Sequence, residues 1–402
     1  MAADLLLQGP ASVLTCADGS GWDPGVVEDA SVVVEDGRVT GVVPASEDLE
    51  AEEVLDVAGT VIAPGFVDAH THPAFAGDRS EEFLLRSRGE DYESIARAGG
   101  GILSTADAVA EEEEGGLAEL VRRRFDTALW NGTTTIEAKS GYGLDPAEEL
   151  KSLRSIRSAA EGHLIRAVPT FLGLHAVPRD THRAAYLDRV LEETLPAVVE
   201  EGLATSFDAF VEGIAFSVDE ARRACRAASD AGLFVRLHAG QLSSMGAVGL
   251  AAEVGAASAD HLEFVEPAEI EALAAAGTVP VCLPAAGHFL RMEVDPPARA
   301  LIDAGLPLAV ATDFNPGSAP MLSMPETLHL ARLRLGLDWH EALRAGTRNA
   351  AQSLGLDDVG WIGPGSAADM VVLDLDEPSH LGYWFGTDPV IAVVAGGQVV
   401  RT

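Results

Sequence analysis

Two histidines separated by one residue follow an apolar stretch early in the sequence. His70 and His72 stand at the end of segment 68–72, directly after the apolar residues 61–67. Side chains two positions apart on a strand point to the same side, so both imidazoles can face one metal ion. A pair of exposed surface histidines would give the same pattern, and from the pair alone that alternative stays open.

Ligand-type residues also end three later apolar stretches. His238 follows residues 234–237, His261 follows 257–260, and Asp313 follows 308–312. Four apolar stretches that all end in such groups are hard to assign to chance. Imidazoles together with a carboxylate form a site suited to zinc or iron.

Such a site predicts attack of hydroxide on a carbonyl or amidine carbon. A metal ion that keeps one position for water makes hydroxide available near neutral pH. Asp313 would bind the ion and accept the proton of that water, while His261 would stabilise the developing oxyanion. Cysteine plays no part in this prediction, because Cys16, Cys225 and Cys282 are scattered and show no paired spacing.

Alternating strands and helices would position these residues. Apolar stretches rich in Val, Ile and Thr are followed by segments with helical spacing, such as 147–160, 218–231 and 268–276. The eight expected strands are 61–68, 133–138, 165–171, 206–211, 234–238, 257–261, 278–283 and 308–312. The pattern predicts an α/β protein with a (β/α)8 TIM barrel, whose functional face lies at the carboxyl ends of the strands. A doubly wound open sheet would show the same alternation.

Both ends of the chain are rich in strands and turns. Segments 30–35 and 38–43 flank Asp36-Gly37, a hairpin signal, and segments 370–375 and 390–394 give further strands. Neither end can bury a sheet alone, so we expect one small β-sandwich built from both. The predicted division assigns residues 1–63 and 356–402 to the sandwich and residues 64–355 to the barrel.

Charge and hydropathy exclude several kinds of partner. The chain has 27 basic and 63 acidic residues, a net charge of −36, which repels the phosphate backbone of nucleic acids. No uncharged apolar stretch reaches the length of a membrane span, and the first residues make a poor signal peptide. We therefore expect a cytoplasmic protein that binds neither nucleic acid nor membrane.

The combination of these residues resembles the amidohydrolase superfamily across the whole chain. Several loops are more specific and are similar to those of the imidazolonepropionase family. These are Gly-Asp-Arg-Ser-Glu-Glu-Phe at 77–83, Gly-Gly-Gly-Ile at 99–102, Glu-Ala-Lys-Ser-Gly-Tyr-Gly-Leu at 137–144, Phe-Leu-Gly-Leu-His-Ala-Val-Pro at 171–178, and Asp-Phe-Asn-Pro-Gly-Ser at 313–318.

The resemblance implies hydrolysis of a small molecule, 4-imidazolone-5-propanoate, to N-formimidoyl-L-glutamate in histidine degradation. It implies one zinc or iron ion, divalent or trivalent, held by His70, His72, His238 and Asp313. Catalysis would fall to Asp313, His261 and Gln241, and Arg79 would pair with the propionate carboxylate. The remaining substrate contacts would come from Tyr92, Tyr142, His175, Gln241, Asn315, Gly317 and Ser318. A homodimer is the family expectation.

Some positions depart from the family's pattern. Gln241 stands at a position where members of the family carry Glu or Gln. Because its side chain is an amide, it cannot act as a carboxylate base. Gly240 replaces an expected Asp, and Val211 replaces a Cys often found beside Glu212. Lys139 lies on the second expected strand, whereas a lysine that bridges two metals would lie on the fourth. One metal is therefore expected, although Glu212 keeps a second conceivable.

Other interpretations stay open at this stage. Arg79 could be a surface arginine paired with Glu81 or Glu82, the two tyrosines could be packing residues, and 315–317 could be only a turn. The enzyme could be another cyclic amide or amidine hydrolase, or an aminopurine deaminase. A metal-binding barrel without turnover would have lost a ligand, and none is lost.

Overall fold

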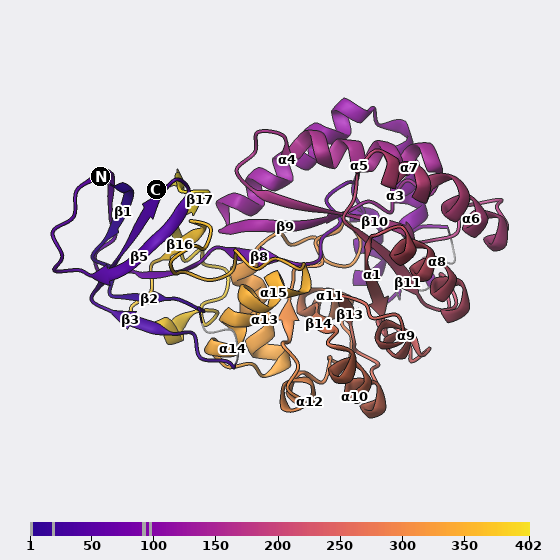
Figure 1. Ribbon diagram of the computed structural model, residues 1–402. Helices are drawn as coiled ribbons and strands as arrows, with labels where there is room; N and C mark the ends of the chain where they lie inside the picture. Colours follow the sequence, from indigo (N-terminus) through magenta and orange to yellow (C-terminus); the bar gives the residue numbers. More distant parts are fainter. Residues whose placement is uncertain (1–2, 18–20, 91–93, 96–98) are drawn as a thin grey trace.

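Eight parallel strands form a barrel in the computed structural model, which describes residues 3–17, 21–90, 94–95 and 99–402 (Figure 1). Neighbouring strands follow the chain order: β8 (Phe66–Asp68), β9 (Thr133–Lys139), β10 (Arg166–Leu174), β11 (Ser206–Val211), β12 (Phe234–Ala239), β13 (Ser258–His261), β14 (Val279–Cys282) and β15 (Ala309–Val310). A doubly wound sheet would reverse this order at its centre. The predicted TIM barrel is therefore confirmed, and the open sheet is excluded.

Backbone hydrogen bonds beyond the last strand bring the two edges of this sheet together. The amide of Asp313 donates to the carbonyl of His70 at 3.0 Å, and the amide of His72 donates to the carbonyl of Phe314 at 2.8 Å. Thr71 and Phe314 form the corresponding parallel bridge. The first histidine pair and the aspartate, far apart in sequence, thus become neighbours at one end of the barrel.

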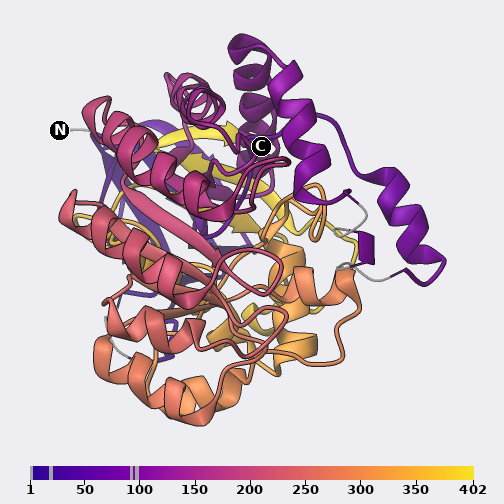
Figure 2. The same ribbon diagram turned by 90° about the vertical axis from the view of Figure 1, so that its right-hand side faces the viewer.

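Helices surround the barrel strands, as the view from the barrel side shows (Figure 2). They are α1 (Ser80–Ser87), α3 (Ile102–Glu111), α4 (Glu114–Trp130), α5 (Pro146–Ala160), α6 (Arg183–Arg189), the π-helix η1 (Val190–Thr194), α7 (Leu195–Glu200), α8 (Val218–Asp230), α9 (Ala247–Glu253), α10 (Pro267–Ala276), α11 (Pro284–Leu290), α12 (Ala298–Asp303), α13 (Met324–Leu335), α14 (Trp339–Ala345) and α15 (Arg348–Ser353). Within the described ranges, no helix is both long and apolar enough to span a membrane.

The two ends of the chain interleave in a pair of small sheets (Figure 1). One sheet has the order β5-β4-β1-β6, from β5 (Arg38–Pro44), β4 (Ala30–Glu35), β1 (Ala3–Gln8) and β6 (Ala51–Asp56). The other has the order β18-β17-β16-β7-β2-β3, from β18 (Gln398–Arg401), β17 (Val390–Ala395), β16 (Met370–Leu373), β7 (Val61–Pro64), β2 (Ser12–Leu14) and β3 (Val26–Glu28). Leu5, Val32, Ile62, Val372 and Val394 belong to the buried core that both sheets share. The prediction of extra β-structure from both chain ends is confirmed.

A glycine marks the passage from the sandwich to the barrel. We expected one strand over residues 61–68, but the structure has β7 in the sandwich and β8 in the barrel, with Gly65 between them. A Cβ atom at Gly65 would lie 2.2 Å from the hydroxyl oxygen of Thr134, so only glycine fits there. The apolar run could not reveal this break, because buried strands in both sheets have the same composition.

Candidate active site

Three imidazole nitrogens meet at the carboxyl ends of the barrel strands. The Nε2 atom of His70 lies 3.2 Å from that of His72 and 3.1 Å from that of His238, and the last two are 3.4 Å apart. An oxygen of Asp313 lies 3.5 Å from Nε2 of His70 and 3.3 Å from Nε2 of His72. All four side chains are buried.

For His70 and His238, the contacts on the far side of the ring show that Nε2 presents a lone pair to the cluster. Nδ1 of His70 lies 2.6 Å from a carboxylate oxygen of Asp260, and Nδ1 of His238 lies 3.0 Å from one of Asp208. A carboxylate fixes the proton on the nitrogen that faces it, which leaves Nε2 bare. Burial lowers the pKa of both His70 and His72 well below the usual histidine range, so neither ring carries a second proton.

This donor set fits a metal ion. Four ligands about 2.0–2.1 Å from a tetrahedral centre lie about 3.3–3.4 Å from one another, close to the spacings of these ligand atoms. Bare nitrogens facing each other at such distances repel unless a cation lies between them. His70, His72 and Asp313 form one candidate cluster for a metal ion, and His70, His238 and His261 form another that shares His70.

A buried network of charged side chains contacts the carboxylates that face the histidines. Lys139 donates to Glu137 at 2.6 Å and lies 2.8 Å from Asp208 and 3.9 Å from Asp260, the two carboxylates that face the histidines. Arg236 approaches Asp260 at 3.6 Å. Burial lowers the pKa of Lys139, but Asp208 and Glu137 outweigh it and hold that pKa above its usual value, so Lys139 is charged. Two cations among three carboxylates leave a negative excess that suits a bound cation.

A tight turn after β15 places Asp313. The residue has a φ of 54°, in the left-handed region that few non-glycine residues adopt. Asn315 holds the turn, because its amide nitrogen donates to the carbonyl of Asp313 at 2.6 Å while its oxygen accepts from the amides of Gly317 and Ser318 at 2.8 and 2.7 Å. The hydroxyl of Ser318 donates to Asp313 at 3.3 Å. The segment is thus both a turn and part of the site.

Three further side chains surround the ligands. His175 stacks on His72 with ring centroids 5.5 Å apart, and its Nδ1 donates to the carbonyl of Gly141 at 2.8 Å. Tyr142 lies 5.1 Å from His175 between ring centroids and is almost fully buried. Burial lowers the pKa of His261 to about 3, so this ring is neutral and keeps one N–H to donate.

These residues line one cavity. Arg79, Gln241, Asn315 and Ser318 line it together with His72, Tyr142, His175, His238, His261 and Asp313, and Ile102 and Phe210 add apolar wall. Arg79 is only 6% exposed, and its Nε donates to Glu82 at 2.7 Å. Arg79 therefore pairs with Glu82 as a surface arginine would, yet lies buried at the cavity.

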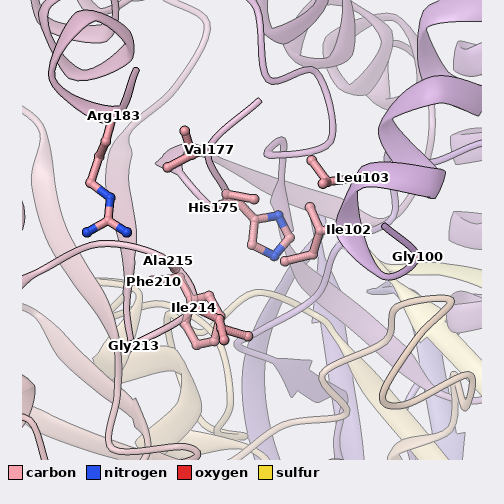
Figure 3. Close-up of a pocket in the computed structure, with 11 residues that line it drawn as sticks. Gly100, Ile102, Leu103, His175, Val177, Arg183, Phe210, Gly213, Ile214 and Ala215 are labelled. Carbon is pink, nitrogen blue, oxygen red and sulfur yellow. The ribbon is translucent and has the colours of Figure 1, made fainter. Parts of the chain in front are cut away.

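A second cavity opens beside the first. It shares Ile102, His175 and Phe210 with the ligand-bearing cavity and extends to Arg183. In the close-up, the imidazole of His175 lies between Ile102 and the side chain of Arg183 (Figure 3). The shared walls make the second cavity a continuation of the first, with a cation at its outer part.

The structure brings together nearly every side chain that the sequence suggests for the site. His70 lies among the ligands without lining the cavity, and Gly317 contacts Arg79. Tyr92 falls outside the described residues. Gly240 has a φ of 69°, which explains why glycine stands there. Glu212 accepts from the amides of Leu242 and Ser243 at 2.8 and 3.1 Å, so its carboxylate holds the loop that follows His238.

Sequence reasoning missed Asp208 and Asp260, and it gave no role to Lys139 beyond excluding a bridging lysine. The signal was present: each is a charged residue inside a fully buried strand, β11, β13 or β9. A buried charge needs a partner, but the strand pattern does not say which one. From the sequence, Glu82 is expected only as a surface partner of Arg79.

Comparisons with known proteins agree with this geometry. A model described as "Amidohydrolase family" matches residues 61–400. The imidazolonepropionase of Shewanella sediminis is 43% identical over 384 residues, 94% of each chain. That of Symbiobacterium thermophilum is 43% identical over 412 residues, covering 99% of this chain and 97% of the relative.

Solved structures support the fold. A zinc-bound adenosine deaminase from Xanthomonas campestris is similar with a TM-score of 0.70 at 21% identity, covering 99% of this chain and 93% of that one. A triazine hydrolase variant has a TM-score of 0.75 at 19% identity, covering 99% and 94%. At such low identities these similarities speak for the fold alone. The family match and the full-length relatives together show that the chain belongs to the amidohydrolase family and, within it, to the imidazolonepropionases.

Proposed function

We propose that this enzyme hydrolyses the imidazolone ring of 4-imidazolone-5-propanoate to N-formimidoyl-L-glutamate, a step of histidine degradation. The observation that carries the proposal is one cavity lined both by three members of the four-ligand cluster, His72, His238 and Asp313, and by the buried Arg79. The cluster suits hydrolysis of a cyclic amide, and the arginine suits a substrate that carries a carboxylate.

Substrate recognition would divide between the two sides of the cavity. The guanidinium of Arg79 would bind the propanoate carboxylate, since planar N–H donors match a carboxylate in pairs. Tyr142 and His175 would flank the ring, and Gln241 would reach its nitrogens. Asn315, Gly317 and Ser318 would contact substrate or product from the turn that carries Asp313. Tyr92 remains a proposed substrate contact from the sequence alone.

The cluster would hold one zinc or iron ion through His70, His72, His238 and Asp313. Such an ion supplies Lewis acidity and lowers the pKa of water. A single ion is favoured because Glu212 is engaged by backbone amides and Lys139 by Asp208 and Glu137.

The chain's own residues would move the protons. Burial raises the pKa of Asp313, which makes this carboxylate a stronger base than a solvated aspartate. Asp313 would take a proton from the attacking water, whose oxygen forms a bond to the ring carbonyl carbon. The neutral His261 would donate its N–H to the carbonyl oxygen as negative charge develops. When the carbon–nitrogen bond breaks, the proton on Asp313 would pass to the departing ring nitrogen, leaving a formimidoyl group and a carboxylic acid, which releases its proton to solvent.

The test is loss of the ultraviolet absorbance of freshly prepared imidazolone propanoate on adding metal-loaded protein. We expect rapid loss, N-formimidoyl-L-glutamate as product, and suppression by a chelator. Aminopurines and other cyclic amidines form the comparison panel. Turnover of a panel compound without turnover of the imidazolone would overturn the proposed substrate while keeping the family.

Two expectations from the sequence accompany this proposal. The enzyme would be a homodimer, which light scattering of the purified protein checks. It would act in the cytoplasm without binding nucleic acid, consistent with a net charge of −36.

A further inference from the structure

Glu82 connects the substrate-side arginine to the turn before α3. The carboxylate oxygen Oε2 receives Nε of Arg79 at 2.7 Å and lies 2.6 Å from its Nη2. The other oxygen, Oε1, accepts from the amide of Gly101 at 2.8 Å and from the hydroxyl of Ser104 at 3.3 Å. One carboxylate therefore holds two segments that meet at the cavity.

Both ends of this connection form the cavity wall. Arg79 lines the cavity from the start of α1, and Ile102, which directly follows Gly101, lines it from the start of α3. Gly101 has φ 72° and ψ −140°, a conformation open to glycine alone. A Cβ atom at Gly100 would lie 3.0 Å from Oε1 of Glu82. The glycine run at 99–101 thus lets the backbone close on this carboxylate.

The negative charge on the outer side of Arg79 favours a residue that keeps its guanidinium in place. Arg79 also borders a third, larger cavity, which Asp78, Glu81, Glu82 and Glu90 line. Without Glu82, the other carboxylates would draw the guanidinium outward, away from the ligand cluster. Glu82 bonds the Nε edge of Arg79, while Nη1 packs against Gly317 at the inner wall.

We propose that Glu82 is a positioning residue for substrate recognition, an inference that rests on the proposed function. It orients Arg79 toward the carboxylate of the substrate and ties that orientation to the wall at Gly101 and Ile102. Glu82 acts through Arg79 and has no contact with the reacting carbon. Its loss therefore weakens substrate binding more than it slows the chemical step.

Kinetics of three variants in the metal-loaded enzyme test the proposal. Glu82→Gln keeps the size and an acceptor oxygen but loses the charge that holds Arg79. Glu81→Gln, the exposed neighbour on the same helix, makes the same charge change without these bonds. We expect Glu82→Gln to raise KM about tenfold with kcat within about twofold of wild type, and Glu81→Gln to change neither. Glu82→Asp, which keeps the charge, should recover part of the loss.

An unchanged KM in Glu82→Gln, or equal changes in both glutamine variants, would overturn the proposal. A lower KM would also overturn it, because Glu82 would then compete with the substrate for Arg79. Failure of the proposed function can be told apart from failure of the role of Glu82, because in the first case the wild-type enzyme itself would leave the imidazolone unchanged.

Hydrogen–deuterium exchange without substrate tests the structural connection separately. Glu82→Ala removes the acceptor of the Gly101 amide, so exchange at that amide should become faster, while Glu81→Ala should leave it at the wild-type rate. Equal exchange at Gly101 in both alanine variants would contradict the connection even if turnover were never seen.

Discussion

Asp313 lies where the site needs both a ligand and a base. Its carboxylate reaches two of the three clustered histidines, and Ser318 donates to its other oxygen. Burial raises its pKa, a direction that suits a group which accepts a proton. No other side chain that lines the cavity combines these properties among the residues described.

Replacing Asp313 with Asn should therefore stop the reaction while preserving the fold. The amide has the same shape but cannot take a proton, and loss of a proton-transfer group costs about 100- to 10,000-fold in rate. We expect kcat to fall by at least that lower factor, with circular dichroism and the thermal midpoint near wild type. Near-normal turnover in this variant would contradict the assigned role.

Gly317 reveals how closely Arg79 packs on the turn. A Cβ atom there would lie 2.0 Å from Nη1 and 2.4 Å from Cζ of Arg79, so Gly317→Ala must displace the guanidinium. We expect KM for the imidazolone to rise about tenfold, or about 1.4 kcal/mol of lost binding. Gly115→Ala is the matched control, because nothing lies within 4 Å of that added Cβ atom. A wild-type KM in Gly317→Ala would argue against the carboxylate role of Arg79.

The strands arrange the ligands, and this arrangement could be predicted from the sequence. A ligand-type residue after an apolar stretch was enough to place His70, His72, His238, His261 and Asp313 at one end of a parallel barrel. The carboxylates that contact the histidines could not be predicted in the same way. Asp260 on β13 reaches His70 from a strand far along the chain, Asp208 reaches His238 from the neighbouring strand β11, and strand composition carries no information about such pairs.

Asp260 on β13 offers a test of that buried support. Asp260→Asn would place an amide beside His70 and Arg236, removing the charge that both contact. Loss of such an outer carboxylate typically weakens metal affinity about 10- to 100-fold. We expect that loss in competition titrations with a chromophoric chelator, and none for the exposed Asp303→Asn control. Equal affinities for both variants would mean that the network does not support the site.

An ion-pair cluster centred on Asp358 connects the sandwich to the barrel. Asp358 lies 2.9 Å from Arg38 on β5 and 2.7 Å from Arg166 on β10. Hydrogen bonds from Arg166, and then the charges of both arginines, hold the pKa of Asp358 below its usual value. The carboxylate is partly exposed, so its contribution to stability is about 1 kcal/mol or less. The residue limits of the sandwich and of the barrel stay predictions.

The sign of the pH dependence follows from the lowered pKa of Asp358. Its contribution is present at neutral pH and is lost as the pH falls from about 4, the unfolded value, through the lower folded value. Asp358→Asn should therefore lower the urea midpoint at pH 7, and the difference from wild type should shrink below about pH 4. Asp376→Asn, an exposed control, should match wild type at both pH values. A difference that grows on acidification would contradict this account.

We propose that one metal ion, held by His70, His72, His238 and Asp313, makes this barrel an imidazolone hydrolase. The most direct measurement is a titration of zinc or ferrous iron into metal-free protein, with bound metal and turnover followed together. We expect no turnover without metal, a linear rise of turnover with added metal, and a plateau at about one ion per chain. Full turnover in verified metal-free protein, or a plateau only at about two ions per chain, would contradict it.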